Sequence, residues 1–283
     1  MSTINKIAVI GAGTMGSGIA HVFSQYGFRV FLVDSEQVFL ERGLSSINNN
    51  MDRQIKKGSI TSEQKNNFLS NIIPIIGHKN IDRNIDLIIE AIYENKSAKL
   101  SILKDLDNLL DNNCIIASNT SSISITELGK NLRSDKFIGM HFMNPVPVMQ
   151  LVELIRGYST SDETFNTIYQ LAINIGKKPV EVFDSPGFIS NRILMPMINE
   201  AIFALYEGVA KAEDIDTVMK LGMNHPMGPL TLADFIGLDV CLAIMEVLYE
   251  GFNDSKYRPC PLLKKMVNAG KLGRKTKAGF FEY

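Results

Sequence analysis

Cysteine is scarce in this chain, where only Cys114, Cys241 and Cys260 occur among 283 residues. The three thiols are odd in number and widely spaced, a pattern that argues against a disulfide framework or a cysteine metal site. We interpret them as reduced, structural thiols of a cytoplasmic protein, and we expect no metal centre.

An excess of charge of either sign is also missing. Lys and Arg number 29 against 30 Asp and Glu, which gives a formal net charge of −1. No overall field therefore attracts nucleic acid or an anionic membrane, and an anionic ligand must be held by local charges. Long apolar runs are absent too, because stretches such as residues 86–92 are interrupted by charge far short of the ~20 residues that a membrane helix needs. The sequence predicts a soluble protein without nucleic-acid or membrane partners.

Targeting segments, internal repeats and low-complexity linkers are not recognisable. The strand-like run at residues 6–10 begins too early to leave room for a signal or transit peptide, so we expect a cytoplasmic protein. With 45% hydrophobic and 21% charged residues, the chain can bury a full core and is long enough for two domains.

Short β-rich runs alternate with helical segments over the first two thirds of the chain. The strand candidates are residues 6–10, 28–33, 72–76, 87–92, 114–117, 137–141, 151–155 and 179–183. This alternation predicts an α/β domain with a mainly parallel, doubly wound sheet, in which the last strands can pair antiparallel. After residues 184–187 helical periodicity takes over, so we predict an α/β domain at 1–185 and an all-helical domain at 186–283.

An apolar stripe too wide for a solvated surface runs along the first predicted helix of the second domain. Its members are Ile189, Ile193, Leu194, Met197, Ile198, Ala201, Ile202 and Leu205. This width indicates burial at a domain or subunit interface. Pro196 lies within the same helix and predicts a kink, because proline has no N–H to donate.

A glycine-rich motif follows the first strand candidate directly. It reads Gly11-Ala12-Gly13-Thr14-Met15-Gly16 and opens a helix-like segment. Such glycines permit a tight turn and a close backbone approach to a pyrophosphate, which the helix N-terminus then binds. Asp34, about 23 residues beyond Gly11, can accept hydrogen bonds from the adenosine ribose and would repel a 2′-phosphate. The pattern predicts an NAD site; the alternative is an ordinary glycine turn with Asp34 as a helix cap.

A histidine and a glutamate fall on neighbouring strand candidates late in the first domain. His141 ends a strand, where open α/β sheets bind ligands. Glu153 lies in a largely apolar run, and a buried carboxylate must be paired to stay charged. Beside His141 it would fix the tautomer of a general base and stabilise its imidazolium. Three alternatives stay open: a structural His141, a Lys or Arg partner for Glu153, and Glu90 as the partner of His141.

Two further polar positions are ambiguous. Ser121 and Ser122 follow the strand candidate at 114–117 and can either meet a ligand at its carboxyl edge or cap the next helix. The amide of Asn191, early in the helical domain, can bind a substrate oxygen or serve the helix start.

These motifs together resemble those of the (S)-3-hydroxyacyl-CoA dehydrogenase family. The resemblance covers nearly the whole chain and rests on residues 11–16, 117–122, 141–149, 184–192 and 226–230. It implies a Rossmann-type NAD-binding domain, a helical domain that forms a homodimer, and an active site between the domains. The implied reaction is the reversible, NAD-dependent oxidation of (S)-3-hydroxyacyl-CoA to 3-oxoacyl-CoA, with short chains such as 3-hydroxybutyryl-CoA and acetoacetyl-CoA as substrates.

The resemblance also implies residue roles. His141 becomes the general base and Glu153 its orienting carboxylate, while Ser121 and Asn191 hold the 3-oxygen of the substrate. The implied contacts to NAD are Gly11, Gly13, Thr14, Met15, Gly16, Asp34, Glu94, Lys99, Asn119 and Lys275, and those to the CoA phosphates are Arg53 and Lys57. Three residues depart from the family pattern: Met143 stands where Phe is frequent, Arg53 where Lys or Ser is frequent, and Lys277 where Gly is frequent.

Two other functions remain open at this point. A related two-domain dehydrogenase of the 3-hydroxy acid or 6-phosphogluconate kind would use a lysine early in the helical domain, but no lysine lies between Lys178 and Lys211. A non-catalytic NAD-binding protein can share the scaffold, since fold does not fix function. It would leave His141, Glu153 and their polar neighbours unexplained.

Overall fold

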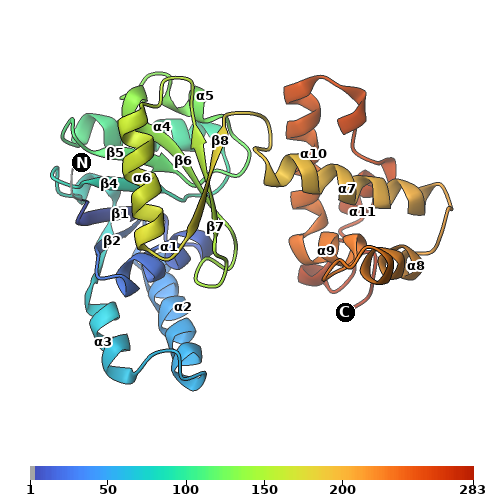
Figure 1. Cartoon of the computed structure of the whole chain (residues 1–283), viewed down its shortest axis with the longest axis horizontal. Helices are drawn as coiled ribbons and strands as arrows, with labels where there is room; N and C mark the ends of the chain where they lie inside the picture. The colour runs from blue at the N-terminus through green and yellow to red at the C-terminus, as the bar shows by residue number, and fades with distance from the viewer. Residues whose placement is uncertain (1–3) are drawn as a thin grey trace. The chain divides into compact units, whose positions relative to one another are not determined.

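The computed structural model describes residues 4–283, which divide into two compact units, one up to Asp184 and one from Ser185 onward (Figure 1). The first unit is built on a β-sheet, and the second consists of helices joined by loops. Of the helices in residues 4–283, none combines the length and the apolar character that crossing a membrane requires.

The sheet of the first unit has eight strands in the order β3-β2-β1-β4-β5-β6-β7-β8. Their bounds are β1 (Lys6–Ile10), β2 (Arg29–Asp34), β3 (Ile72–Ile76), β4 (Leu87–Glu90), β5 (Ile115–Ser118), β6 (Phe137–Phe142), β7 (Leu151–Arg156) and β8 (Lys178–Phe183). The strand order runs outward from β1 in both directions, so the predicted doubly wound, mainly parallel sheet is confirmed.

The pairing of the last strands was predicted only in part. β6 and β7 are antiparallel, as expected, but β7 and β8 are parallel. The reason is helix α6 (Asp162–Asn174), which connects β7 to β8 as a crossover and returns the chain in the same direction. β4 also ends earlier than expected, at Glu90, because the N–H of Ile92 donates to the side chain of Glu90 at 2.8 Å instead of continuing the ladder.

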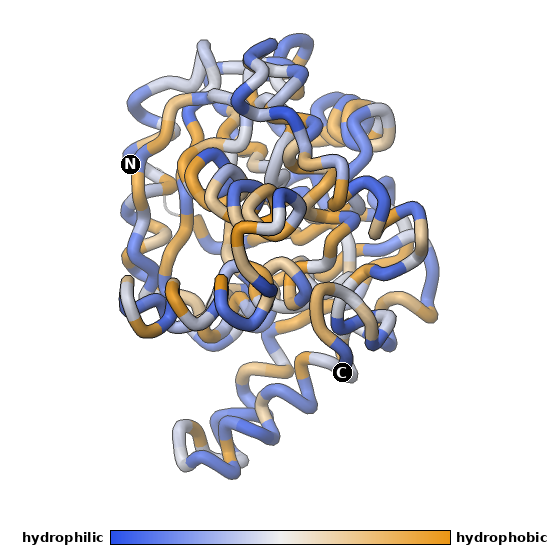
Figure 2. Tube along the Cα trace, turned by 90° about the vertical axis from the view of Figure 1, so that its right-hand side faces the viewer, coloured by the Kyte–Doolittle hydropathy of each residue, from blue (hydrophilic) through white to orange (hydrophobic). Residues whose placement is uncertain are grey.

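Helices and short 3-10 turns connect the strands of the first unit. They are α1 (Thr14–Gln25), α2 (Gln37–Lys56), α3 (Ser62–Ser70), η1 (His78–Asn80), α4 (Lys96–Leu109), α5 (Ile125–Gly129) and η2 (Ser134–Lys136). α2 and α3 form an arm that extends from the sheet at the bottom of Figures 1 and 2, where hydrophilic and hydrophobic residues alternate along it. The apolar face of α2 packs inward, with Leu40, Ile47 and Met51 at most 1% exposed. These three side chains belong to a hydrophobic core that they share with residues of β1, β2 and α1.

The second unit contains a core of its own. Its elements are α7 (Ser190–Tyr206), α8 (Ala212–Thr217), η3 (Val218–Gly222), α9 (Pro229–Ile236), α10 (Leu238–Phe252), η4 (Ser255–Tyr257), α11 (Pro261–Asn268) and η5 (Arg274–Thr276). Buried Asp234 accepts hydrogen bonds from the N–H groups of Phe280 and Phe281, which fixes the C-terminal segment against α9. On α7, Ile198 and Ile202 belong to this core, whereas Ile193 is 67% exposed. The apolar stripe thus exceeds what the unit itself buries.

Candidate active site

The glycine-rich motif forms the turn between β1 and α1. Gly11 has a φ of 104°, in the region that favours glycine, and its N–H donates to the carbonyl of Val33 at 2.7 Å. A Cβ atom on Gly16 would lie 1.8 Å from the carbonyl oxygen of Gly11, so only glycine permits this approach of helix to loop. Gly13 is the N-cap of α1 and brings no side chain to the first-turn amides. The turn leaves a helix N-terminus suited to an anion.

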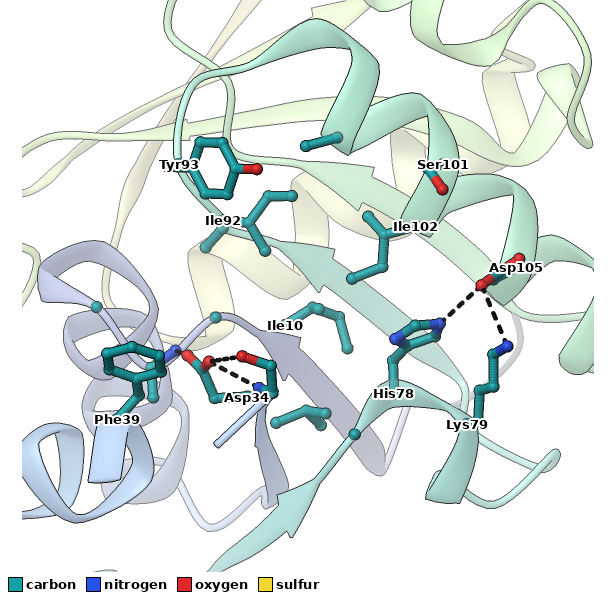
Figure 3. Close-up of a pocket in the computed structure, with 18 of the residues that line it drawn as sticks. Ile10, Asp34, Phe39, His78, Lys79, Ile92, Tyr93, Ser101, Ile102 and Asp105 are labelled. Carbon is teal, nitrogen blue, oxygen red and sulfur yellow. Dashed lines mark hydrogen bonds and ion pairs between the residues drawn. The ribbon is translucent and has the colours of Figure 1, made fainter. Parts of the chain in front are cut away.

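Asp34 at the end of β2 is held against this turn. Its Oδ2 accepts the N–H of Ala12 at 2.7 Å, and its Oδ1 accepts the N–H of Ser35 at 2.7 Å (Figure 3). Oδ1 also accepts the hydroxyl of Ser35 at 3.3 Å, whereas Oδ2 keeps a lone pair that can accept a hydrogen bond from a ligand hydroxyl. The acid is therefore oriented before any ligand arrives.

A cavity of about 1010 Å³ lies beside the turn and Asp34 (Figure 3). Its lining continues to His78 after β3 and to Asp105 on α4, with apolar residues between, and it includes Phe39 and Arg42 on α2. Its volume is that of a typical cofactor site. Sequence analysis missed these four residues. The carboxyl end of the third strand candidate was the available signal for His78, but α4 and α2 reach the cavity only through the fold.

Glu90 and Lys99, next in sequence to the cavity-lining residues Ala91 and Ala98, form a buried ion pair. The Lys99 ammonium lies 2.7 Å from Glu90 Oε1, and the two side chains are 1% and 0% exposed. It also contacts the carbonyl of Ile92 and Glu94 Oε2, both at 3.3 Å. The hydroxyl of Ser118 donates to the other oxygen of Glu90 at 2.5 Å. The structure thus pairs Glu90 with Lys99 rather than with His141.

Glu94 organises the serine-rich turn after β5. Its Oε1 accepts the hydroxyl of Thr120 at 2.6 Å and the N–H groups of Ser121 and Ser122 at 2.9 and 3.1 Å. Desolvation raises the pKa of Glu94, but the Lys99 ammonium and these hydrogen bonds outweigh it and lower the pKa below its usual value. An ionised carboxylate therefore holds the turn that carries Ser121.

Asn119 connects β5 to the end of β6. Its side-chain oxygen accepts the N–H of Phe142 at 3.0 Å, and its own N–H donates to the carbonyl of Glu90 at 2.7 Å. The oxygen of the amide is thus turned toward the protein. The amino group is the end of the side chain with hydrogens to donate to a ligand.

His141 and Glu153 lie directly opposite each other on the antiparallel strands β6 and β7. His141 Nδ1 is 2.7 Å from Glu153 Oε2, and the two residues are 8% and 2% exposed. An ionised carboxylate only accepts hydrogen bonds, so Nδ1 carries the hydrogen and Nε2 of the neutral ring becomes the acceptor. The pair has the geometry of a general base held by an acid.

Arg53 and Lys57 occupy the far end of α2. The N–H of Lys57 donates to the carbonyl of Arg53 at 3.1 Å, so the two side chains are one helical turn apart, and both are exposed. Arg53 Nη1 donates to the side chain of Asn50 at 3.3 Å. These cations lie on the arm rather than in the cavity beside Asp34.

Asn191 and Lys275 belong to the second unit. Asn191 lies in the first turn of α7 and is 9% exposed. Lys275 contacts both oxygens of Asp239 at 2.5 Å. Lys277 has a φ of 59°, which explains physically why glycine suits this position in the family pattern.

Comparison with known proteins assigns both units. The family model described as 3-hydroxyacyl-CoA dehydrogenase, NAD binding domain, matches residues 6–185, and that of the C-terminal domain matches residues 187–283. A probable 3-hydroxybutyryl-CoA dehydrogenase of Bacillus subtilis is 54% identical over 99% of this chain and 98% of its own length. A 3-hydroxybutyryl-CoA dehydrogenase of Bradyrhizobium diazoefficiens is 53% identical, with 100% and 96% covered.

A solved structure agrees with these sequence relatives. The crystal structure of (S)-3-hydroxybutyryl-CoA dehydrogenase from Ralstonia eutropha is 50% identical and superposes with a TM-score of 0.96, covering 99% of either chain. Likeness at this level extends over the NAD-binding and the C-terminal domain alike. The chain therefore belongs to the 3-hydroxyacyl-CoA dehydrogenase family and is an NAD-dependent oxidoreductase of that family.

Proposed function

We propose that this protein interconverts short-chain (S)-3-hydroxyacyl-CoA and 3-oxoacyl-CoA, with 3-hydroxybutyryl-CoA and acetoacetyl-CoA as its substrates. The observation that carries the proposal is the pair of His141 and Glu153, 2.7 Å apart at the ligand-binding edge of a sheet that also bears an NAD turn. The names of full-length relatives at 53–54% identity support the short acyl chain. We assign residues 1–185 to cofactor binding and residues 186–283 to the helical domain.

The residues of the first unit fit the adenosine half of NAD. The amides of the turn from Gly11 to Gly16, with Thr14 and Met15 at the helix start, would hold the pyrophosphate, and the fixed carboxylate of Asp34 the ribose. Glu94 and Asn119 shape the loops next to it, and Lys99 acts as a positioning residue, because it is nearly inaccessible and contacts Glu90 and Glu94. Lys275 completes the proposed contacts from the second unit.

NAD, when bound, supplies the acceptor for the hydride that leaves C3 of the alcohol. Nε2 of His141 takes the hydroxyl proton in this direction and returns it when the 3-oxoacyl-CoA is reduced. Glu153 keeps the ring in the required tautomer and balances the charge of the imidazolium. Ser121, on the turn fixed by Glu94, and Asn191 hold the 3-oxygen.

The CoA moiety carries phosphates that need cations. Arg53 and Lys57 are exposed and one helical turn apart on α2, and we assign them to these phosphates. The alternative for this pair is an ordinary solvated helix face.

A homodimer through the helical unit is part of the proposal. Ile193, Val209 and Leu221 are 67%, 74% and 81% exposed on this unit, and exposed apolar surface favours association. Sedimentation velocity at two protein concentrations tests this, and a monomer at the higher one contradicts it. We also place the protein in the cytoplasm, where its few cysteines stay reduced.

Steady-state kinetics tests the reaction. Reduction of 3-oxoacyl-CoA with NADH, followed by loss of NADH absorbance over acyl lengths from four to sixteen carbons, should give the highest kcat/KM at four carbons. A maximum at long chains would contradict the substrate assignment. Absence of turnover throughout would favour a non-catalytic NAD-binding protein on this scaffold.

A further inference from the structure

Three neighbouring parallel strands end beside different parts of the nucleotide cavity. β1 leads into Gly11, β2 ends at Asp34, and β3 leads through Gly77 into His78. Adjacent strands are ~4.8 Å apart, and the N–H of Gly77 donates to the carbonyl of Asp34 at 2.7 Å. From β1 to β3, the strand ends thus present the glycine turn, then Asp34, then His78. In the adenosine half of NAD, the pyrophosphate, the ribose and the base follow one another in the same order. His78 therefore falls at the base.

The cavity is apolar between its two polar ends. Ile10, Ile92 and Ile102 line it, and Figure 3 shows Ile10 between Asp34 and His78, with the other two across from it. Such walls suit the flat faces of a purine but offer nothing to its polar edge. The groups that can meet this edge are gathered around His78, where Lys79, Asp105 and Ser101 also line the cavity.

Asp105 fixes the tautomer of His78. His78 Nε2 lies 3.0 Å from Asp105 Oδ2, and Figure 3 shows the ring between Asp105 and the interior of the cavity. The hydrogen bond from His78 lowers the pKa of Asp105, so the carboxyl is ionised and can only accept. Nε2 must then carry the hydrogen, and Nδ1 of the neutral ring is a hydrogen-bond acceptor.

We propose that His78 is a specificity residue for the base of the dinucleotide: its Nδ1 accepts a hydrogen bond from the 6-amino group of adenine and rejects a 6-oxo purine. A carbonyl at that position would set its lone pairs against the lone pair of Nδ1 and leave both acceptors unsatisfied. The inference rests on the proposed placement of NAD in this cavity. It concerns recognition alone and leaves the proton transfer at His141 unaffected.

The test compares NAD with nicotinamide hypoxanthine dinucleotide, in which a 6-oxo group replaces the 6-amino group of the base and N1 carries a hydrogen. Isothermal titration calorimetry at pH 8, where ordinary imidazoles are neutral, should give a Kd for the analogue about 10-fold higher, because an unsatisfied polar group costs ~1–3 kcal/mol. Equal affinities in the unmodified protein would overturn base recognition. If neither dinucleotide binds, the placement of NAD in the cavity fails as well.

Two substitutions distinguish recognition of the base by His78 from a purely structural role of this residue. His78→Phe keeps a ring but has no acceptor, so the ratio of the two Kd values should fall to about 1; a ratio that stays near 10 contradicts the proposal. Asp105→Asn allows the ring of His78 to carry its hydrogen at Nδ1. The analogue should then bind more tightly, so the ratio of the two Kd values should fall. A structural defect would instead weaken the binding of both dinucleotides. Lys104→Gln is the matched control: this exposed lysine precedes Asp105 on α4 but is not among the residues that line the cavity, so the ratio should stay unchanged.

Discussion

Removal of the proton acceptor at His141 is the most direct test of the proposed chemistry. Gln in place of His141 keeps a polar side chain on β6 but has no basic nitrogen. General acid–base catalysis contributes roughly 10²- to 10⁴-fold, so kcat should fall by that factor. The Kd of NAD should barely change, because the glycine turn and Asp34 are separate from this residue.

The partner carboxylate gives a second, smaller effect. Glu153 is 2% exposed and its Oε2 lies 2.7 Å from the ring, so its charge acts with little screening by water. Glu153→Gln can still hold the ring but cannot balance the imidazolium. A hydrogen bond to a charged group contributes ~1.5–3 kcal/mol, which corresponds to a loss in kcat of about 10- to 100-fold.

The double substitution decides whether the two residues act as one unit. Once the base is gone, its partner has nothing to stabilise, so the double variant should match His141→Gln alone. Steady-state assays with acetoacetyl-CoA and NADH give the four rates, and circular dichroism controls for folding. Additive losses would show that the residues act independently, and near-normal turnover in a folded His141→Gln protein would remove His141 from the chemistry.

Three more predictions follow from the described contacts. The kcat/KM should be higher with NADH than with NADPH because Asp34 repels a 2′-phosphate. Asp34→Ser should reduce this difference, since Arg42 in the same cavity then supplies an unopposed positive charge. Equal kcat/KM values for the two cofactors in the unmodified enzyme would contradict this prediction. Replacing Arg53 and Lys57 with Ala should raise KM for acetoacetyl-CoA much more than it lowers kcat, and an unchanged KM at low salt would leave them on a solvated face. Burial, opposed by the Gln54 hydrogen bond, lowers the pKa of His21 from 6.5 to about 4. Between these two pH values the unfolded chain binds a proton that the folded chain does not. The free energy of unfolding therefore decreases as the pH is lowered. His21→Gln, which cannot titrate, should lose about 2 kcal/mol less than the unmodified protein in urea unfolding between pH 7 and pH 5; equal losses count against a buried neutral His21.

Local patterns were sufficient where function depends on residues close together in sequence. The glycine turn and the strand–helix alternation were readable because each is defined within one βα unit, and the relatives confirm NAD and the family. His141 and Glu153 were singled out from strand position and burial, and the antiparallel register of β6 and β7 places them opposite each other. Their catalytic roles stay a prediction.

Two side-chain pairings near the cavity could not be predicted from the sequence. Nothing local indicated that Lys99 would pair with Glu90 rather than reach solvent, or that Asp105 on α4 would meet His78 after β3. His78 and Asp105 lie on elements that approach only in the folded sheet, whereas Lys99 is nine residues from Glu90 and its inward orientation follows from how α4 packs after β4. The direction of β8 was missed for the same reason, since it depends on the crossover through α6.

The buried ion pair of Glu90 and Lys99, with the more exposed carboxylate of Glu94 3.3 Å from the ammonium, restricts how this part of the fold can be altered. The three charges lie on β4, on α4 and on the turn between them, and they fix the connection that carries the cavity-lining residues Ala91, Ile92 and Tyr93. Loss of Glu90 or Lys99 alone leaves an uncompensated buried charge, which costs ~3–5 kcal/mol. A single replacement of Glu90 or Lys99 therefore destabilises the fold before it changes the affinity for the cofactor. Any redesign of this connection must replace Glu90 and Lys99 together by a pair of neutral residues.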